Sequence, residues 1–252
     1  MDATESGTTA SLDPLAELTE SFAESATHLF AASSVADTLA VVAQLAKDTI
    51  EGCDFAGLFV LDGAEISTPA HTDQIVVEID AIQQRTGEGP CLDAVSKGLV
   101  FYASDLVGDD RWPKFAPLAI AAGIRSALAL PLLPAGRAGA VNLYARYPDA
   151  FGVVDRARGV LLASLSSLAI DAARAHEDEQ HLISNLTSAL ATRELIGQAQ
   201  GILMERERIT PDEAFDVLRR ASQHLNRKLR DVAHNLIDTG ESPDTGAAKP
   251  PA

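Results

Sequence analysis

The sequence predicts an α+β protein: a domain with a central antiparallel sheet, then a long helix, then an all-α module of three helices. Two apolar runs, 127–132 and 138–145, flank a short turn, which is typical of paired antiparallel strands. Apolar residues at heptad spacing continue from Val160 to Ile196 without proline or glycine, which indicates one long helix. Two short amphipathic segments follow residue 208, each after a helix-start signal.

The first domain is expected to begin with two helices, over 14–30 and 35–50, because apolar residues recur there at helical spacing. Ser34 is the expected N-cap of the second helix, and Gly52 its stop signal. Helices followed by an antiparallel sheet with helical insertions are typical of an α+β domain. Further strands are expected at 55–61, 64–70 and 99–104, a short helix at 75–82, and turns at 62–63 and 135–137.

The long helix, predicted over 155–208, carries a heptad stripe that favours a parallel coiled coil and hence a homodimer. The alternative is an amphipathic helix packed against its own domain. The acidic cluster at 177–179 interrupts the stripe. The stripe positions are 161, 165, 168, 172, 175, 179, 182, 186, 189, 193, 196, 200 and 203.

The terminal module has clear helix signals. Thr210, Pro211 and Glu213 form an expected capping box with proline at the first helical position. Ala214, Phe215, Leu218 and Ala221 are the expected apolar face of that helix, and Asn226 is the expected cap of the next. The sequence thus divides into a tail over 1–13, a first domain over 14–175, a terminal module over 184–238 and a disordered tail over 239–252.

Charge is distributed unevenly along the chain. The net charge is −16, so a uniform surface would repel nucleic acids and anionic membranes. Residues 184–240 hold eight basic and eight acidic residues, whereas the rest of the chain holds 12 basic and 28 acidic residues. Residues 217–230 contain five cations and no carboxylate, which is typical of a phosphate-binding patch or, alternatively, of a solvated face.

Two glycines, Gly197 and Gly201, lie four residues apart inside the long helix. Each costs about 1 kcal/mol relative to alanine, and together they leave bare backbone on one side. That bare strip permits close approach of another helix or of a nucleic-acid backbone.

Other chemistry is sparse. Two cysteines exclude a disulfide scaffold and suit a reducing cytoplasm. The N-terminus lacks the features of a signal peptide, no apolar run predicts a membrane span, and the six histidines show no metal-ligand spacing. Gly87 and Gly89 form a turn predicted to border any ligand cavity. Cys91 follows in a first helical turn, where the helix dipole would lower the thiol pKa and permit redox sensing. The alternative is a buried, inert cysteine.

Residues 191–238 closely resemble the ANTAR domain, a three-helix RNA-binding module of transcription antiterminators. The resemblance rests on the run at 199–204, the apolar spacing over 214–221 and the segment 226–233. One departure is Gln200, where many members have lysine. Residues 14–175 resemble a GAF domain of actinobacterial type, through the motifs at 87–94, 110–113, 125–132 and 142–145.

These resemblances imply an antiterminator that binds tandem RNA stem-loops as a homodimer, under control of a GAF domain with an unknown small-molecule ligand. A DNA-binding regulator and, less favoured, a thiol-dependent enzyme on the GAF scaffold are the alternatives. No catalytic residue, cofactor, metal or membrane association is expected. The candidate RNA-binding residues are Arg193, Gln198, Gly201, Arg219, Arg220, Gln223, Asn226, Arg227, Lys228 and Arg230. The candidate ligand-binding or redox residues are Gly87, Gly89 and Cys91.

Overall fold

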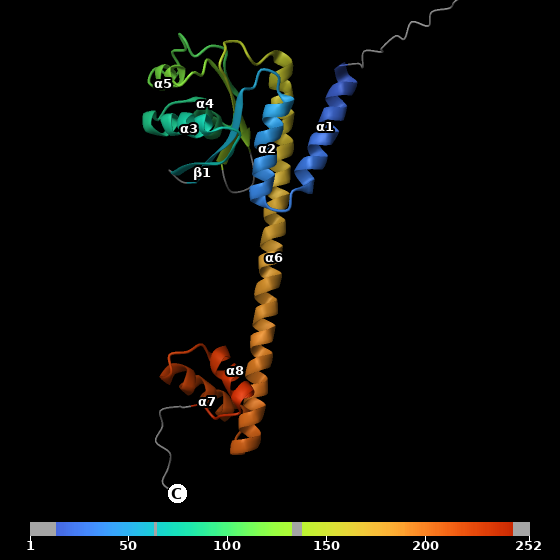
Figure 1. Ribbon diagram of the computed structural model, residues 1–252, viewed down its shortest axis with the longest axis vertical. Coiled ribbons are helices and arrows are strands. Elements are labelled where there is room, and N and C mark those ends of the chain that lie inside the picture. The colour runs from blue at the N-terminus through green and yellow to red at the C-terminus, as the bar shows by residue number, and fades with distance from the viewer. Residues whose placement is uncertain (1–13, 63–64, 133–137, 244–252) are drawn as a thin grey trace, which may run out of the picture. The chain divides into compact units, whose positions relative to one another are not determined.

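A computed structural model describes residues 14–62, 65–132 and 138–243 (Figure 1). The chain forms two compact units, 1–177 and 178–252. The expected turn tips at Gly63 and 135–137, the first tail and residues 244–252 of the second tail lie outside the described residues.

The first unit is built on a five-stranded sheet in which every neighbouring pair is antiparallel. The strand order is β2 (Glu65–His71), β1 (Phe55–Asp62), β5 (Ala138–Ala145), β4 (Ser126–Leu132) and β3 (Phe101–Ala103). The predicted antiparallel pairing of the two apolar runs is confirmed, since β4 pairs with β5, and β5 lies at the centre of the sheet.

Helices cover both faces of this sheet, which therefore separates two hydrophobic cores (Figure 1). On one face, α2 (Val35–Thr49) and residues 162–170 of α6 (Val153–Glu207) pack on Val141 and Leu143 of β5. α1 (Pro14–Ala31) contributes Leu29 to this core. The other face carries α3 (Gln74–Thr86), α4 (Pro90–Lys97) and α5 (Phe115–Ala121). Ser34 caps α2 as expected, through a hydrogen bond from the backbone N–H of Asp37.

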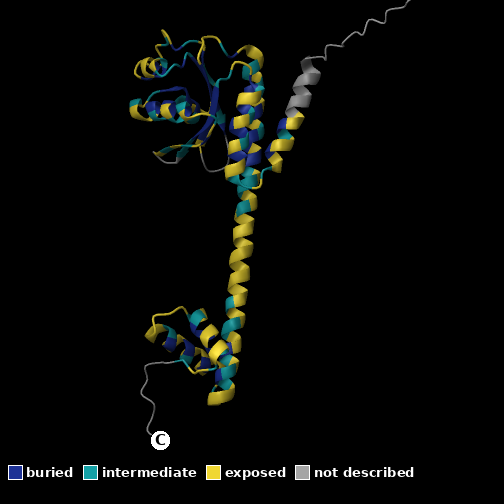
Figure 2. Ribbon diagram, viewed as in Figure 1, coloured by how far each residue is buried: buried dark blue, intermediate teal, exposed yellow. Residues whose placement is uncertain are grey.

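Helix α6 confirms the predicted long helix. Within the first unit, its buried residues include Leu162, Ala163 and Ile170, whereas Leu161 and Leu168 are exposed. Every residue from Asp178 to Ala191 is exposed, so this stretch packs on nothing in the described part of the chain (Figure 2).

The second unit is a three-helix module formed by the end of α6 with α7 (Pro211–His224) and α8 (Leu229–Thr239). The predicted capping box is present, because Thr210 and Glu213 exchange both hydrogen bonds. Gln200 Nε2 donates to the Pro211 carbonyl at 2.9 Å, and Arg206 Nη1 donates to the Gly240 carbonyl. The core consists of Ala199, Leu203, Ala214, Leu218, Ala221, Val232, Ala233 and Leu236.

Three expectations for this module need correction. Asn226 does not cap α8; it has a φ of 50° in the connection after α7, and Lys228 occupies the N-cap position. Asparagine tolerates this left-handed conformation better than most residues. Phe215 does not join the core, since it is 38% exposed. The end of the heptad stripe is not free for a partner, because Leu203 is fully buried among α7 and α8, and Ile196 packs against the same cluster.

Candidate nucleic-acid interface

The cations of the terminal module gather where α7 meets α8. Arg219 and Arg220 lie on the exposed side of α7, opposite the buried Leu218 and Ala221. The connection supplies Arg227 and Lys228, and Arg230 follows in the first turn of α8. All five side chains are exposed. We call these five residues the basic corner.

Local carboxylates neutralise only part of the basic corner. Arg219 pairs with Asp216 at 2.8 Å, and Arg230 lies 3.3 Å from Asp231. Within the described residues, Arg220, Arg227 and Lys228 have no ion pair. The backbone that carries Arg227 is fixed, since Ser222 Oγ donates to its carbonyl at 2.6 Å. The corner therefore presents three unpaired cations on a defined backbone, an arrangement suited to phosphate contacts.

Two amide residues lie beside the corner. Gln223 is exposed near the end of α7, and Asn226 is exposed in the connection. Because Asn226 does not cap α8, its side chain is available for other partners. The basic corner and these two amides thus form one surface.

The candidates on α6 form a second group. Gly201 is open, since a Cβ added there, or at Gly197, would meet nothing within 4 Å. No part of the described chain therefore explains these glycines by close helix packing. Arg193 and Gln198 are exposed near them. At 3.6 residues per turn, those two side chains point about 140° apart around the helix axis, so they do not share one face.

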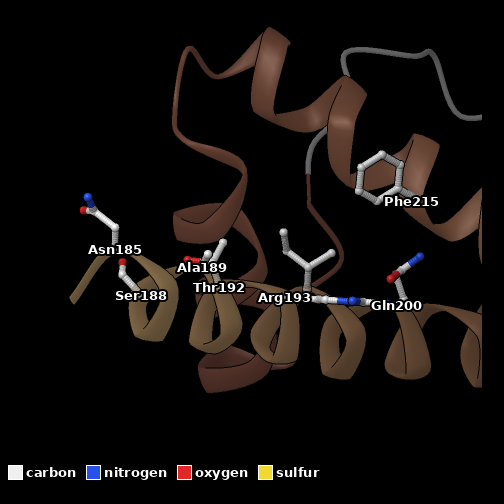
Figure 3. A pocket seen from close by; sticks show the side chains of 8 residues that line it. Asn185, Ser188, Ala189, Thr192, Arg193, Gln200 and Phe215 are labelled. Carbon is white, nitrogen blue, oxygen red and sulfur yellow. The ribbon is translucent and has the colours of Figure 1, made fainter. Parts of the chain in front are cut away.

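A groove of about 580 Å³ lies between α6 and α7 (Figure 3). Of the ten predicted RNA-binding residues, only Arg193 lines it. Sequence reasoning missed this groove because it assigned Phe215 to the core. The lining residues are Asn185, Ser188, Ala189, Thr192, Arg193, Ile196, Gln200 and Phe215.

In the first unit, local packing accounts for the glycine-rich turn. Gly87 ends α3 in the left-handed conformation, with a φ of 68°. Gly89 has a φ of 147°, and a Cβ there would lie 2.3 Å from Gln83 Oε1. That same oxygen accepts a hydrogen bond from the Cys91 backbone N–H at 2.8 Å. Other cavities lie between α2 and β2 and among α1, α2 and α6, and residues 86–91 line neither. Ligand binding at this turn stays a prediction.

A buried polar cluster lies between the sheet and α3, and sequence reasoning did not predict it. Asp80 Oδ1 accepts hydrogen bonds from Asn142 Nδ2 at 3.0 Å, Tyr144 Oη at 3.1 Å and Gln83 Nε2 at 3.3 Å. Thr68 Oγ1 donates to Asp80 Oδ2 at 2.7 Å. Burial raises the pKa of Asp80 to about 7, despite these four donors.

Cys91 touches this cluster, with its Sγ 3.2 Å from Tyr144 Oη. The thiol is fully buried, and burial, followed by the nearby charge of Asp80, raises its pKa well above the ordinary value. The lowered pKa expected from the helix dipole is therefore wrong, because desolvation outweighs the dipole here. Burial also raises the pKa of Cys53 to about 12.

We expect Cys91 to be unreactive in the folded protein. In a Cys53→Ser variant, an aromatic disulfide reagent at pH 8 should label Cys91 orders of magnitude more slowly than it labels the same variant in denaturant, because thiolate and access are both lacking. Absorbance of the released thiol measures this rate. Rapid labelling without denaturant would show that the thiol is accessible and restore the redox-sensor interpretation.

The described ranges contain neither a group of metal-ligating side chains nor a candidate membrane-spanning helix. Among residues 14–62, 65–132 and 138–243, no three His, Cys, Asp or Glu side chains gather as a metal site. Nor is any helix there long and apolar enough to cross a membrane.

Solved structures share the fold of the first unit. The GAF domain of a phosphoenolpyruvate-protein phosphotransferase from Coxiella burnetii is similar at 16% identity, with a TM-score of 0.53, over 66% of this chain and 99% of that one. A free methionine-R-sulfoxide reductase from Neisseria meningitidis is similar at 18% identity, with a TM-score of 0.50, over 65% of this chain and 94% of that one.

A further similarity covers less of the other protein. This chain spans 63% of the chromophore-binding domain of a bacteriophytochrome from R. palustris, at 12% identity and a TM-score of 0.49 over 64% of this chain. A search of curated protein sequences found no significant match.

The fold therefore defines an α+β domain of GAF type, followed by a long helix and a helical module. The GAF domain family model matches residues 32–171, more than half of the chain, and the chain belongs to that family. The ANTAR domain model matches residues 184–237, so the terminal module is an ANTAR domain. Both domains are regulatory, and the protein is a regulatory protein.

Proposed function

We propose that the protein is a signal-regulated RNA-binding antiterminator of the actinobacterial GAF–ANTAR type. The ANTAR module binds stem-loop RNA, and the GAF domain controls that binding in response to a small molecule. The place of action is the cytoplasm. The basic corner carries this proposal, because it concentrates five exposed cations in a protein of net charge −16 and lies within the segment matched by the ANTAR model.

The active form is a homodimer that binds two stem-loops in tandem. Its support is the stretch from Asp178 to Ala191, which is exposed throughout. Leu182 and Leu186, both on the predicted heptad stripe, are 59% and 56% exposed. Pairing with a second copy would bury these leucines, which nothing else in the described chain covers.

Two other functions have less support. A DNA-binding regulator also fits three short helices and a basic patch, but antiterminators with an ANTAR domain act on RNA. A thiol-dependent enzyme needs two reactive cysteines, whereas burial raises the pKa of both Cys53 and Cys91. We therefore propose a protein without enzymatic activity.

The experiment that tests RNA binding uses the full chain and a labelled pool of RNA hairpins with one stem and randomised loops. Arg220→Ala, Arg227→Ala and Lys228→Ala should each weaken binding about equally for all loop sequences. Each should also flatten the dependence of log affinity on log salt by up to about one unit, since each removes one phosphate contact. Affinity is measured by fluorescence anisotropy at several salt concentrations.

Arg219→Ala and Arg230→Ala should have smaller effects, because Asp216 and Asp231 already neutralise these two side chains in part. Arg85→Ala, an exposed arginine of the first unit, is the matched control and should not change affinity. Duplex DNA that competes as well as the hairpin pool would contradict the RNA proposal and favour the DNA-binding one.

A further inference from the structure

We propose that the groove between α6 and α7 holds one unpaired RNA base, stacked on the ring of Phe215. This inference rests on the proposed RNA binding and adds the place where a loop base is recognised. None of the five residues of the basic corner lines this groove.

The position of Phe215 suits base stacking. Its neighbours on the inner side of α7, Ala214, Leu218 and Ala221, are all fully buried. Phe215 itself is 38% exposed at the edge of the groove, above the side of α6 that carries Arg193 and Gln200 (Figure 3). An exposed aromatic ring beside a cavity is a platform for an unpaired base, because every base has a flat face that stacks on it.

The remaining lining supplies hydrogen bonds. Gln200 is held in place, since its Nε2 donates to the Pro211 carbonyl. Its Oε1 accepts no hydrogen bond from the described residues, so it can accept one from a base amino group. Arg193, Thr192 and Asn185 add donors and acceptors along α6. Unpaired bases are read in this way, by stacking combined with hydrogen bonds to their edges.

Charge also favours a nucleotide. The groove lining includes one arginine and no carboxylate, although the whole chain has 36 acidic residues. The absence of acidic side chains removes repulsion of the phosphates that flank a bound base. Arg193 is exposed, so it can reach one of those phosphates or the base itself.

A protein helix is a poorer occupant of the groove. Leu182 and Leu186, the exposed leucines that a partner helix would cover in the proposed dimer, do not line the groove. The stripe positions that do line it are Ala189, Arg193, Ile196 and Gln200; two of these are polar, and Ile196 already packs against the core of the module. The residues of α6 that do line it are mostly polar. With a volume of about 580 Å³, the groove has the size of small-ligand sites and accommodates a base with part of its backbone.

The test begins with one tight-binding hairpin, selected with the full wild-type chain from the pool of randomised loops. Phe215→Ala should lower affinity for this hairpin about tenfold or more, the usual value of one stacked base. Phe215→Tyr should retain affinity, because tyrosine stacks equally well. Leu118→Ala is the matched control, since Leu118 is a similarly exposed apolar residue, at 43%, on α5 of the first unit.

Abasic nucleotides then identify the base. Replacing each loop base in turn should reveal one position whose removal weakens the wild type but scarcely affects Phe215→Ala, because both changes remove the same contact. A blunt RNA duplex with the same stem should bind Phe215→Ala and the wild type alike. Thermal unfolding and molar mass of each variant are measured beside affinity.

The outcomes separate the two proposals. If the wild type binds no hairpin, the proposed function fails, and this inference fails with it. If the wild type binds but Phe215→Ala behaves as Leu118→Ala does, the base pocket alone is overturned. A change in molar mass on Phe215→Ala, or equal losses on hairpin and duplex, also overturns it, because the groove would then serve a protein contact or the module as a whole.

Discussion

Replacing Asp80 with asparagine is expected to make the GAF domain more stable near neutral pH and to remove most of its loss of stability between about pH 4 and pH 7. Asp80 is 1% exposed, and burial raises its pKa to about 7. An aspartate in the unfolded chain has a pKa of about 3.9. The folded state therefore holds a proton that the unfolded state has already lost across this range.

The sign of the effect follows from this difference. A raised pKa in the folded state means that stability is fully present below about pH 4 and is lost as pH rises through about 7. A difference of about three pKa units corresponds to about 4 kcal/mol of unfolding free energy. Asparagine carries no charge at any of these pH values, so the variant avoids that loss.

Asparagine also fits the site. Its Oδ1 retains the three donors from Gln83, Asn142 and Tyr144. Its Nδ2 then replaces the oxygen that accepts from Thr68, whose hydroxyl can rotate and accept instead. The substitution therefore removes a buried charge and keeps the three hydrogen bonds that Oδ1 accepts.

Denaturant unfolding of the wild type, Asp80→Asn and Glu78→Gln from pH 4 to pH 8 measures this prediction. Glu78 is an exposed carboxylate on the same helix and serves as the control for titration of the surface. If the stability of the wild type falls no more steeply with rising pH than that of Asp80→Asn, the prediction is refuted. The pKa of Asp80 in the folded protein would then not be raised.

The strands and helices of the first unit follow from local patterns, whereas its buried polar cluster does not. Alternation along 138–145 puts Asn142 on the same face as Ala140 and Tyr144, both buried. From this alternation, the sequence could have predicted that Asn142 faces the core, which would have indicated a buried polar cluster. Asp80 and Gln83 gave a weaker signal, because acidic and amide residues in a helix are usually exposed.

Local rules also misjudged residues whose role depends on tertiary packing. Asparagine after a helix fits both an N-cap and a left-handed connection, and the fold uses Asn226 for the second. The helix dipole lowers the pKa of an exposed thiol, but burial reverses the direction at Cys91. Phe215 has the spacing of a core residue, although α8 leaves its side of α7 uncovered.

Helical period identifies an apolar face but not its partner. The stripe through 161–203 has one continuous spacing, yet Leu203 is buried within the ANTAR module while Leu168 is 64% exposed. Leu165 is half-buried against the core of the first unit. A charge at Leu165 would therefore destabilise the GAF domain whether or not the protein dimerises, and a clean test of the dimer needs positions that are exposed.

Replacing Leu182 and Leu186 together by glutamate is expected to dissociate the proposed dimer without unfolding either unit. Both side chains are exposed and lie in the stretch that contacts nothing else in the described chain. In a parallel coiled coil, the charges of the two copies would face each other across the seam. Ser184→Glu with Ala191→Glu adds the same charge to the outer side of the helix and is the matched control.

Dissociation should weaken binding to an RNA with two tandem stem-loops by roughly a hundredfold or more, because two tethered contacts bind far more tightly than one. Binding to a single stem-loop should change little, since each basic corner remains intact. Sedimentation gives the molar mass, and anisotropy gives affinity for both RNAs. If the double variant stays dimeric, the two copies do not contact each other through Leu182 and Leu186, and the proposed coiled coil is contradicted. A monomeric variant that loses equal affinity for both RNAs would contradict tandem binding, because the two ANTAR modules would then contribute no avidity.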